Sequence, residues 1–239
     1  RVEMNPADMA RQGLRSGDLV RVKSKRGELT LPARPSDQIQ PLQAFIAMHW
    51  GSQYLLCKNS QGESCFGVNS VTTSSRCATS KQPELKHAAV QIDPSPLQHA
   101  EGRISACGWI SSERLASVRS ELWRLLSELD MAYLVPFADP QAELSNTLPR
   151  SGWVLQGRSR QALSDVWVNQ VLALLGLDQS NPIVYRDNPS GQMRTLQLSP
   201  PQSDGRRSLQ GFCLVGHLDS TEWLTELLQQ GVAMDWPAR

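Results

Sequence analysis

The strongest constraint on the fold is a change in hydrophobic periodicity partway along the 239 residues. Before "DPSPLQ" (Asp93–Gln98), apolar residues mainly alternate with polar ones, which is the period of a half-buried strand. After it, apolar residues recur at intervals of three and four, which is the period of an amphipathic helix. The prolines of that segment break any regular element. We therefore predict a mainly β domain over residues 1–93, a linker over 94–100 and an α+β domain over 101–239.

The first half is predicted to begin with one short helix and a β-hairpin. In "MNPADMARQGL", Asn5 is a suitable N-cap, Pro6 takes the first helical position and Gly13 favours termination. In "DLVRVKSKRGELTL", alternating apolar residues flank a turn in which Gly27 can adopt positive φ. The run "LQAFIAMHW" has the composition of a strand buried on both faces, and "HAAVQI" predicts a closing strand.

Three helices are predicted in the second half. Ser111 or Ser112 caps the first, and the second, in "RQALSDVWVNQVLALLGL", stops at Gly176. The third, in "DSTEWLTELLQQG", has Asp219 as N-cap and Glu222 as capping-box partner. The segment "MRTLQLSPPQSDGRRSLQGFCLVG" predicts two strands around a loop. The expected apolar stripes are Leu115, Val118, Leu122, Leu125 and Leu129 in the first helix, and Leu163, Val166, Val171 and Leu174 in the second.

Composition limits the classes of function. The formal net charge is +1, so no global field favours nucleic acid or an acidic membrane surface. The aliphatic runs are too short to span a bilayer, and we therefore expect no nucleic-acid and no membrane partner. The chain starts on Arg1 without a signal peptide, so we expect a cytoplasmic piece of a longer protein.

The sequence contains no recognisable catalytic or metal-binding motif. It lacks the G-x-S-x-G, H-E-x-x-H, P-loop and G-x-G-x-x-G patterns. Its cysteines form no C-x-x-C pair, and their odd number favours free thiols in a reducing compartment. We therefore predict no catalytic residue, no metal ligand and no disulfide among Cys57, Cys65, Cys77, Cys107 and Cys213.

Polar residues at the ends of predicted strands form the candidate site. His49 and Trp50 either pack structurally or face a planar ligand at a sheet edge. Asn69 is either a turn former or an amide with a specific partner, and Lys86 is either a surface lysine or a ligand contact. The segment "SKQPELKHAAV" (Ser80–Val90) fits either a solvated turn or a row of donors along a polar ligand. If these groups converge on one rim of a β-barrel, they would offer aromatic, amide and ammonium contacts to a nucleotide.

Four segments in order resemble one known family: "VEMNPADMARQGLRSGDLVRVKSKRGELTLPARPSD", "FIAMHWG", "GVNSVT" and "SKQPELKHAAVQI". They are similar to the C-terminal molybdopterin-dinucleotide-binding domain of bacterial molybdenum oxidoreductases, with assimilatory nitrate reductase catalytic subunits as the nearest type. The resemblance covers Val2–Ile92. It implies a double-psi β-barrel, truncated at its start, that binds the guanine-nucleotide ends of a molybdenum bis-(molybdopterin guanine dinucleotide) cofactor, Mo-bis-MGD.

The resemblance also implies which residues contact the cofactor. The family has cofactor contacts at the positions of His49, Asn69 and Lys86, and we add Trp50 and Gln82 as neighbours. The family places a first strand, the molybdenum-ligating cysteine and a 4Fe-4S cluster upstream of the region matched here. It therefore implies that upstream domains of the same chain are partners, and that this chain alone is inactive.

Residues 101–239 show a looser resemblance. "VYRDNPSGQMRTLQL" and "LQGFCLVGHLDSTEWLTELLQQG" are similar to the small C-terminal part of pyridine-nucleotide-disulfide reductases, as found within assimilatory nitrite reductases. Three hypotheses follow for the whole chain. It is the C-terminal part of a nitrate reductase that reduces nitrate to nitrite, part of a formate dehydrogenase-type molybdenum enzyme, or a non-catalytic docking module. The docking partner would be an electron-donor reductase or a ferredoxin.

Overall fold

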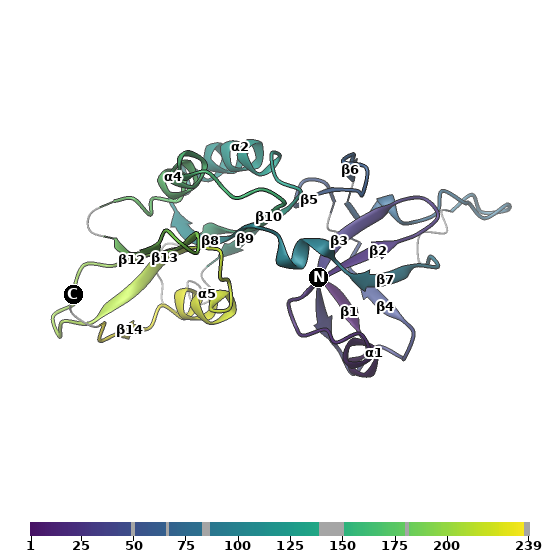
Figure 1. Ribbon diagram of the computed structural model, residues 1–239, viewed down its shortest axis with the longest axis horizontal. Coiled ribbons are helices and arrows are strands. Elements are labelled where there is room, and N and C mark those ends of the chain that lie inside the picture. The colour runs from purple at the N-terminus through teal and green to yellow at the C-terminus, as the bar shows by residue number, and fades with distance from the viewer. Residues whose placement is uncertain (49–50, 66, 83–86, 139–150, 180–181, 237–239) are drawn as a thin grey trace. The chain divides into compact units, whose positions relative to one another are not determined.

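The computed structural model describes residues 1–48, 51–65, 67–82, 87–138, 151–179 and 182–236. The chain divides into two compact units, Arg1–Ala100 and Glu101–Arg239, and each is described by itself. Figure 1 labels the helices and strands of both. None of the described helices combines the length and the apolar character needed to cross a lipid bilayer.

A five-stranded sheet forms the body of unit 1, in the order β4-β1-β3-β2-β7. β1 runs parallel to β3, and the other neighbouring pairs are antiparallel. The strands are β1 (Val2–Met4), β2 (Leu19–Lys23), β3 (Glu28–Pro35), β4 (Ala44–Ile46) and β7 (Gln91–Pro94). Unit 1 is mainly β, as predicted, but its described strands form an open sheet and do not close into a barrel.

The predicted N-terminal helix and hairpin are confirmed. α1 (Pro6–Arg11) follows Asn5, whose side chain accepts a hydrogen bond from the Ala7 N–H at 2.9 Å. In the β2–β3 hairpin, Val20 and Val22 are fully buried and lie opposite leucines of β3. On β2 the alternation reflects one buried face and one more exposed face, whereas residues 28–33 of β3 are buried on both faces.

Outside the sheet, unit 1 contains a small hairpin and two single-turn 3-10 helices. The hairpin joins β5 (Leu55–Lys58) to β6 (Ser64–Cys65). The 3-10 helices are η1 (Gly67–Ser70) and η2 (Pro96–His99). Residues 94–100, which the sequence predicted as a linker, contain η2 and belong to unit 1.

Two other expectations for unit 1 are corrected. The apolar run before Gly51 contains only the three-residue β4, where Phe45 is 52% exposed. It is not buried on both faces, because β4 is an edge strand of the sheet. The closing strand begins at Gln91 rather than at His87, and it pairs with β2.

Unit 2 is an antiparallel sheet with helices on both faces. Its strands follow the order β11-β12-β13-β8-β10-β9, and β14 pairs with β13. In Figure 1, α2 (Leu115–Leu126) and α4 (Asp165–Leu174) cover one face, and α5 (Thr221–Gln230) covers the other. The strands are β8 (Gly102–Ile110), β9 (Met131–Ala138), β10 (Ser151–Ser159), β11 (Ile183–Asp187), β12 (Gln192–Leu198), β13 (Arg207–Val215) and β14 (Ala233–Met234).

The helix starts of unit 2 differ from the prediction. α2 begins at Leu115, because the preceding residues form a turn in which the Arg114 N–H donates to the Ser111 carbonyl at 3.0 Å. α5 follows Ser220 rather than Asp219, and its N-cap side chain makes no capping hydrogen bond. The expected capping box is therefore not formed.

The apolar stripe predicted for α4 is confirmed at Val171 and wrong at Leu163 and Val166. Ser164 caps the helix by accepting the Trp167 N–H at 3.2 Å. Val166 is consequently 70% exposed, and Leu163 precedes the helix. The side chains that face the core are Trp167, Val168, Val171 and Leu172. Because successive helical residues are turned by about 100°, Val166 lies about 140° around the helix axis from Val171 and falls on the exposed side.

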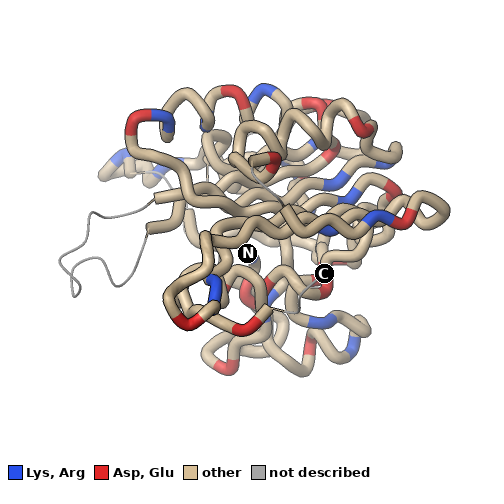
Figure 2. The backbone as a smooth tube through the Cα atoms, turned by 90° about the vertical axis from the view of Figure 1, so that its left-hand side faces the viewer, with Lys and Arg blue, Asp and Glu red and all other residues tan. Residues whose placement is uncertain are grey.

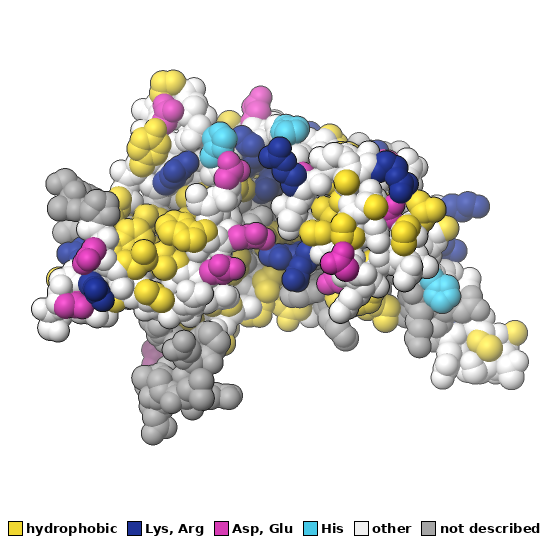
Figure 3. All heavy atoms as spheres, turned by 90° about the horizontal axis from the view of Figure 1, so that it is seen from below, with side chains coloured by type: hydrophobic (Ala, Val, Ile, Leu, Met, Phe, Trp, Pro, Cys, Tyr) yellow, Lys and Arg dark blue, Asp and Glu magenta, His cyan; other side chains and the backbone are white. Residues whose placement is uncertain are grey.

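The core under α5 is formed by apolar residues from the helix and from β13. Phe212 and Leu228 are fully buried there, and Leu224 is 3% exposed. Hydrophobic side chains also gather on the surface that carries α5 and β14 (Figure 3), where Trp223 is 56% exposed and Val232 is 45% exposed.

Candidate functional site

Two of the five predicted site residues fall within the described part of the chain. Asn69 lies in η1, and Gln82 ends a turn that starts at Cys77. His49, Trp50 and Lys86 lie outside the described residues. We therefore build the site from Asn69, Gln82 and their surroundings.

The 3-10 helix η1 is fixed against the β2–β3 hairpin, and this places Asn69 at the surface. Val68 and Val71 are 5% and 3% exposed, whereas the Asn69 side chain is exposed. A Cβ atom at Gly27 would lie 2.7 Å from the Ser70 carbonyl oxygen, so this close approach requires glycine in the hairpin turn. The Asn69 side-chain amide has no hydrogen-bond partner within the described part of the chain, so it is available to a ligand.

Gln82 is positioned by a tight turn of its own. The Cys77 N–H donates to the Gln82 carbonyl at 2.9 Å, and the Lys81 N–H donates to the Cys77 carbonyl at 3.0 Å. Lys81 has a φ of 59°, in the left-handed region, which lets the chain reverse within so few residues. The Gln82 side chain is exposed, and it forms no hydrogen bond with any residue described here.

The same turn carries positive charge. Arg76 and Lys81 are exposed, and neither forms an ion pair within the described ranges. Figure 2 shows that cations and anions are otherwise interspersed along the chain rather than gathered on one surface. Guanidinium and ammonium groups bind phosphate through charge-assisted hydrogen bonds, and carboxamides both donate to and accept from base and ribose groups. Amides and cations of this kind are the groups that nucleotide-binding sites use.

Sequence reasoning did not select Arg76 and Lys81 as site residues. The only signal was two cations flanking a polar segment, which is also the composition of a solvated turn. The structure adds information that the spacing does not contain. The closed turn fixes Lys81 and the Gln82 amide on one short loop that directly follows Arg76.

A reactive thiol lies in the same turn. Hydrogen bonds from Ser80 to the Cys77 sulfur, including its backbone N–H at 3.5 Å, lower the pKa of Cys77 to about 7. A thiol with this pKa is about half ionised at neutral pH, and the thiolate is the nucleophilic form. Cys77 is half-buried, so reagents in solution can reach it.

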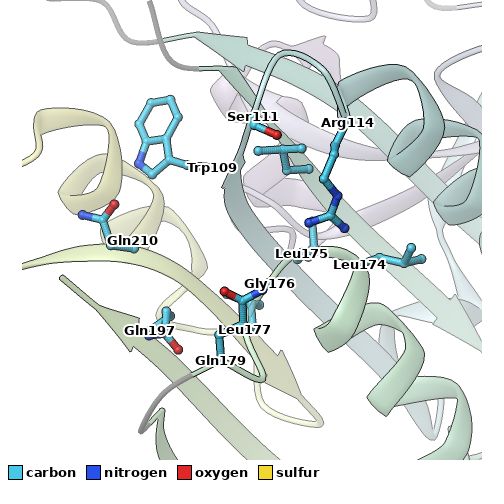
Figure 4. A pocket seen from close by; sticks show the side chains of 11 residues that line it. Trp109, Ser111, Arg114, Leu174, Leu175, Gly176, Leu177, Gln179, Gln197 and Gln210 are labelled. Atoms are coloured by element: carbon cyan, nitrogen blue, oxygen red, sulfur yellow. The ribbon is translucent and has the colours of Figure 1, made fainter. Parts of the chain in front are cut away.

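A separate pocket of about 240 Å³ lies in unit 2, at the C-terminal end of α4. Gly176 ends the helix with a φ of 66°, and the Leu177 N–H donates to the Leu172 carbonyl at 2.8 Å. In Figure 4, Arg114 and Gln179 point toward the pocket from the segment before α2 and the loop after α4. Among the described residues, its lining includes Ser111 but no His, Cys, Asp or Glu that could activate a serine hydroxyl.

The described residues contain no group of three or more His, Cys, Asp or Glu side chains arranged to hold a metal ion.

Most of unit 1 matches a known family of domains. Residues 1–89 match the family model described as the molydopterin dinucleotide binding domain. Asn69 and Gln82 both lie within the matched residues.

Two curated proteins that are similar to this chain are both nitrate reductases. A nitrate reductase from Synechocystis is 42% identical over 72 residues, which cover 30% of this chain and 9% of the relative. A nitrate reductase from Klebsiella oxytoca is 35% identical over 91 residues, which cover 38% of this chain and 10% of the relative. The chain thus spans about a tenth of the length of these relatives.

Proposed function

We propose that this chain is part of a molybdenum oxidoreductase, specifically an assimilatory nitrate reductase that converts nitrate to nitrite and water with two electrons and two protons. The observation that carries the proposal is the molybdopterin dinucleotide domain over residues 1–89, together with nitrate reductase relatives at 42% and 35% identity. Bound Mo-bis-MGD would supply the redox chemistry at its molybdenum, and on the family resemblance the metal ligand would lie in an upstream domain. This chain contributes cofactor anchorage.

The residues of unit 1 would hold the guanine dinucleotide end of the cofactor. The amides of Asn69 and Gln82 would contact base or ribose, and Arg76 and Lys81 would neutralise phosphate charge. This neutralisation is needed because a polyanion is costly to bring against a protein wall. On the family resemblance, His49, Trp50 and Lys86 would complete the contacts, and an upstream strand would complete a double-psi barrel.

Unit 2 would serve as a docking or spacer domain. Among the described residues its pocket is lined by no His, Cys, Asp or Glu, and its surface carries exposed apolar side chains beside α5. An electron-donor reductase or a ferredoxin is the partner that such an enzyme requires. We place the enzyme in the cytoplasm, because free cysteines without a disulfide framework are typical of reducing compartments.

The proposal is tested by loading of the full-length enzyme with molybdenum. Lys81→Met and Lys86→Met each remove one ammonium group and keep the side-chain stem. A charge-assisted contact is worth roughly 1.5–3 kcal/mol, so each variant should bind the cofactor roughly 10- to 100-fold more weakly. Molybdenum content should fall, and turnover per bound molybdenum should stay near the wild-type value.

The matched control is Lys23→Met, which removes an exposed ammonium group from β2. Its molybdenum content should equal that of the wild type, because an isolated surface charge contributes little. Full molybdenum loading of both Lys81→Met and Lys86→Met would refute the assignment. An equal loss in the control would show an effect of general charge rather than of a site.

A further inference from the structure

Two cysteines of unit 1 lie directly opposite each other across a hairpin. Cys57 of β5 is the register partner of Cys65 of β6. Directly opposed residues of an antiparallel pair project to the same face, with Cα atoms about 4.5–5.5 Å apart. This separation lies within the range of about 4.4–6.8 Å that a disulfide spans. The two side chains are 3% and 8% exposed.

The turn of the hairpin holds this register. The Asn59 N–H donates to the Glu63 carbonyl at 2.8 Å, and the Asn59 side-chain oxygen accepts the N–H groups of Gln61 at 3.0 Å and Glu63 at 2.8 Å. Gly62 takes a φ of 83°, which the turn requires and which glycine tolerates. A slip of one residue would break these bonds, so the two cysteines stay opposed.

The two thiols also contact each other. A hydrogen bond between them is the largest cause of opposite shifts, raising the pKa of Cys57 and lowering the pKa of Cys65. Cys65 is therefore the thiol that ionises first, with Cys57 as the donor. It ends the two-residue strand β6 and follows the exposed Ser64.

We propose that Cys57 and Cys65 form a reversible dithiol–disulfide couple that exchanges with a low-molecular-weight disulfide of the glutathione type. The Cys65 thiolate attacks one sulfur of the small disulfide and releases one small thiolate, which takes up a proton. Cys57 then loses its proton and displaces the second small thiol from Cys65. In sum, the two protein thiols lose two electrons and two protons, and the small disulfide becomes two thiols.

The other cysteines do not share this geometry. Cys107 in β8 lies opposite Phe212, and Cys213 in β13 lies opposite Ala106, so their side chains project to opposite faces of the unit 2 sheet. Both are fully buried, and burial raises the pKa of Cys213 to about 12. The couple is thus specific to the β5–β6 hairpin. It does not depend on the proposed function.

The experiment equilibrates the folded 239-residue chain in buffers of graded ratios of reduced to oxidised glutathione. The reaction is quenched by alkylation, and proteolytic peptides are assigned by mass spectrometry. We expect one two-electron transition, a mass loss of two hydrogens and a peptide pair joined through Cys57 and Cys65. Reduced buffer should restore both alkylated thiols.

Two variants and one control make the test specific. Cys65→Ser and Cys57→Ser should each abolish the joined peptide, and Cys65→Ser should slow the first exchange step more. Cys213→Ala should leave the joined peptide and its midpoint unchanged. Absence of the joined peptide in wild-type chain held in fully oxidised buffer, with its circular dichroism intact, would overturn the proposal. Equal joining of either cysteine to Cys77 would also overturn it.

Discussion

Removal of the Asp8 carboxylate should destabilise unit 1. Asp8 lies in the first turn of α1 and is 6% exposed. One of its oxygens accepts the Leu42 N–H at 2.6 Å, and the other lies 2.9 Å from the Arg11 guanidinium. Leu42 has a φ of 63°, a left-handed conformation that a leucine holds only when its surroundings fix it. The carboxylate therefore joins the helix to the chain that leads into β4.

The size of the stability loss in Asp8→Ala follows from these contacts. The hydrogen bond between the Asp8 carboxylate and the Leu42 N–H contributes about 1.5–3 kcal/mol. The ion pair adds at most about 1 kcal/mol, because the Arg11 side chain is 63% exposed. The negative charge near the N-terminus of the helix adds about 0.3–1 kcal/mol. We expect Asp8→Ala to lower the free energy of unfolding by about 2–4 kcal/mol.

Calorimetry and hydrogen exchange measure this effect. For a unit of about 100 residues the loss should lower the Tm of its transition by roughly 10–20 °C. The Leu42 amide should also exchange faster with solvent. Arg11→Ala is the control, since it removes the exposed ion pair alone and should cost less than about 1 kcal/mol. An Asp8→Ala transition within 0.5 °C of the wild type, or an equal loss in Arg11→Ala, would refute the reasoning.

Three further predictions concern single residues. Alkylation of Cys77 should be half-maximal near pH 7, in keeping with its lowered pKa, and Ser80→Ala should move the midpoint to higher pH; a midpoint unchanged in that variant would contradict the assigned cause. Gly152→Ala should lower the free energy of unfolding of unit 2, measured by chemical denaturation, by at least about 1–3 kcal/mol, the usual cost of overpacking. The new Cβ would overlap the Gly108 carbonyl oxygen and lie 2.6 Å from the Phe137 ring. Burial lowers the pKa of Arg158 from 12.5 to about 10, so Arg158→Met should raise stability at pH 7 by about 1–3 kcal/mol. That gain should shrink as the pH rises through about 10, because the wild-type side chain then loses the charge whose burial is unfavourable.

The sequence predicted those elements whose local signals agree with their packing. The α1 cap at Asn5 and the alternation of Val20 and Val22 both match the structure. The central strands β8 and β10 were not predicted, although β10 pairs with β8 over its whole length. Glycine within a strand weakens the local signal. At Gly152 and Gly157, glycine is required because the Phe137 ring and the Leu129 side chain occupy the space of a Cβ. This packing involves residues that are distant in sequence, so a local sequence pattern does not predict it.

For the candidate site, the family resemblance indicated Asn69, Gln82 was added as a neighbouring residue, and the structure supplied the setting of both. The resemblance did not indicate that η1 is held by two buried valines and by the turn at Gly27. It also did not single out Arg76 and Lys81. The phosphate-binding role proposed for them depends on a turn closed by backbone hydrogen bonds, which the residue types in the segment do not predict.

The cysteines show most clearly that a local sequence pattern does not predict which side chains lie close together in the fold. Motif spacing finds ligands that lie close in sequence on one loop or element, as in C-x-x-C, and by that criterion all five thiols were incidental. Strand register instead pairs residues whose separation depends on the length of the intervening turn. The turn at Asn59–Gly62 fixes Cys57 opposite Cys65, so their proximity follows from the turn rather than from cysteine spacing. A turn longer by one residue would place the two thiols on opposite faces, and the same cysteines would then be chemically independent.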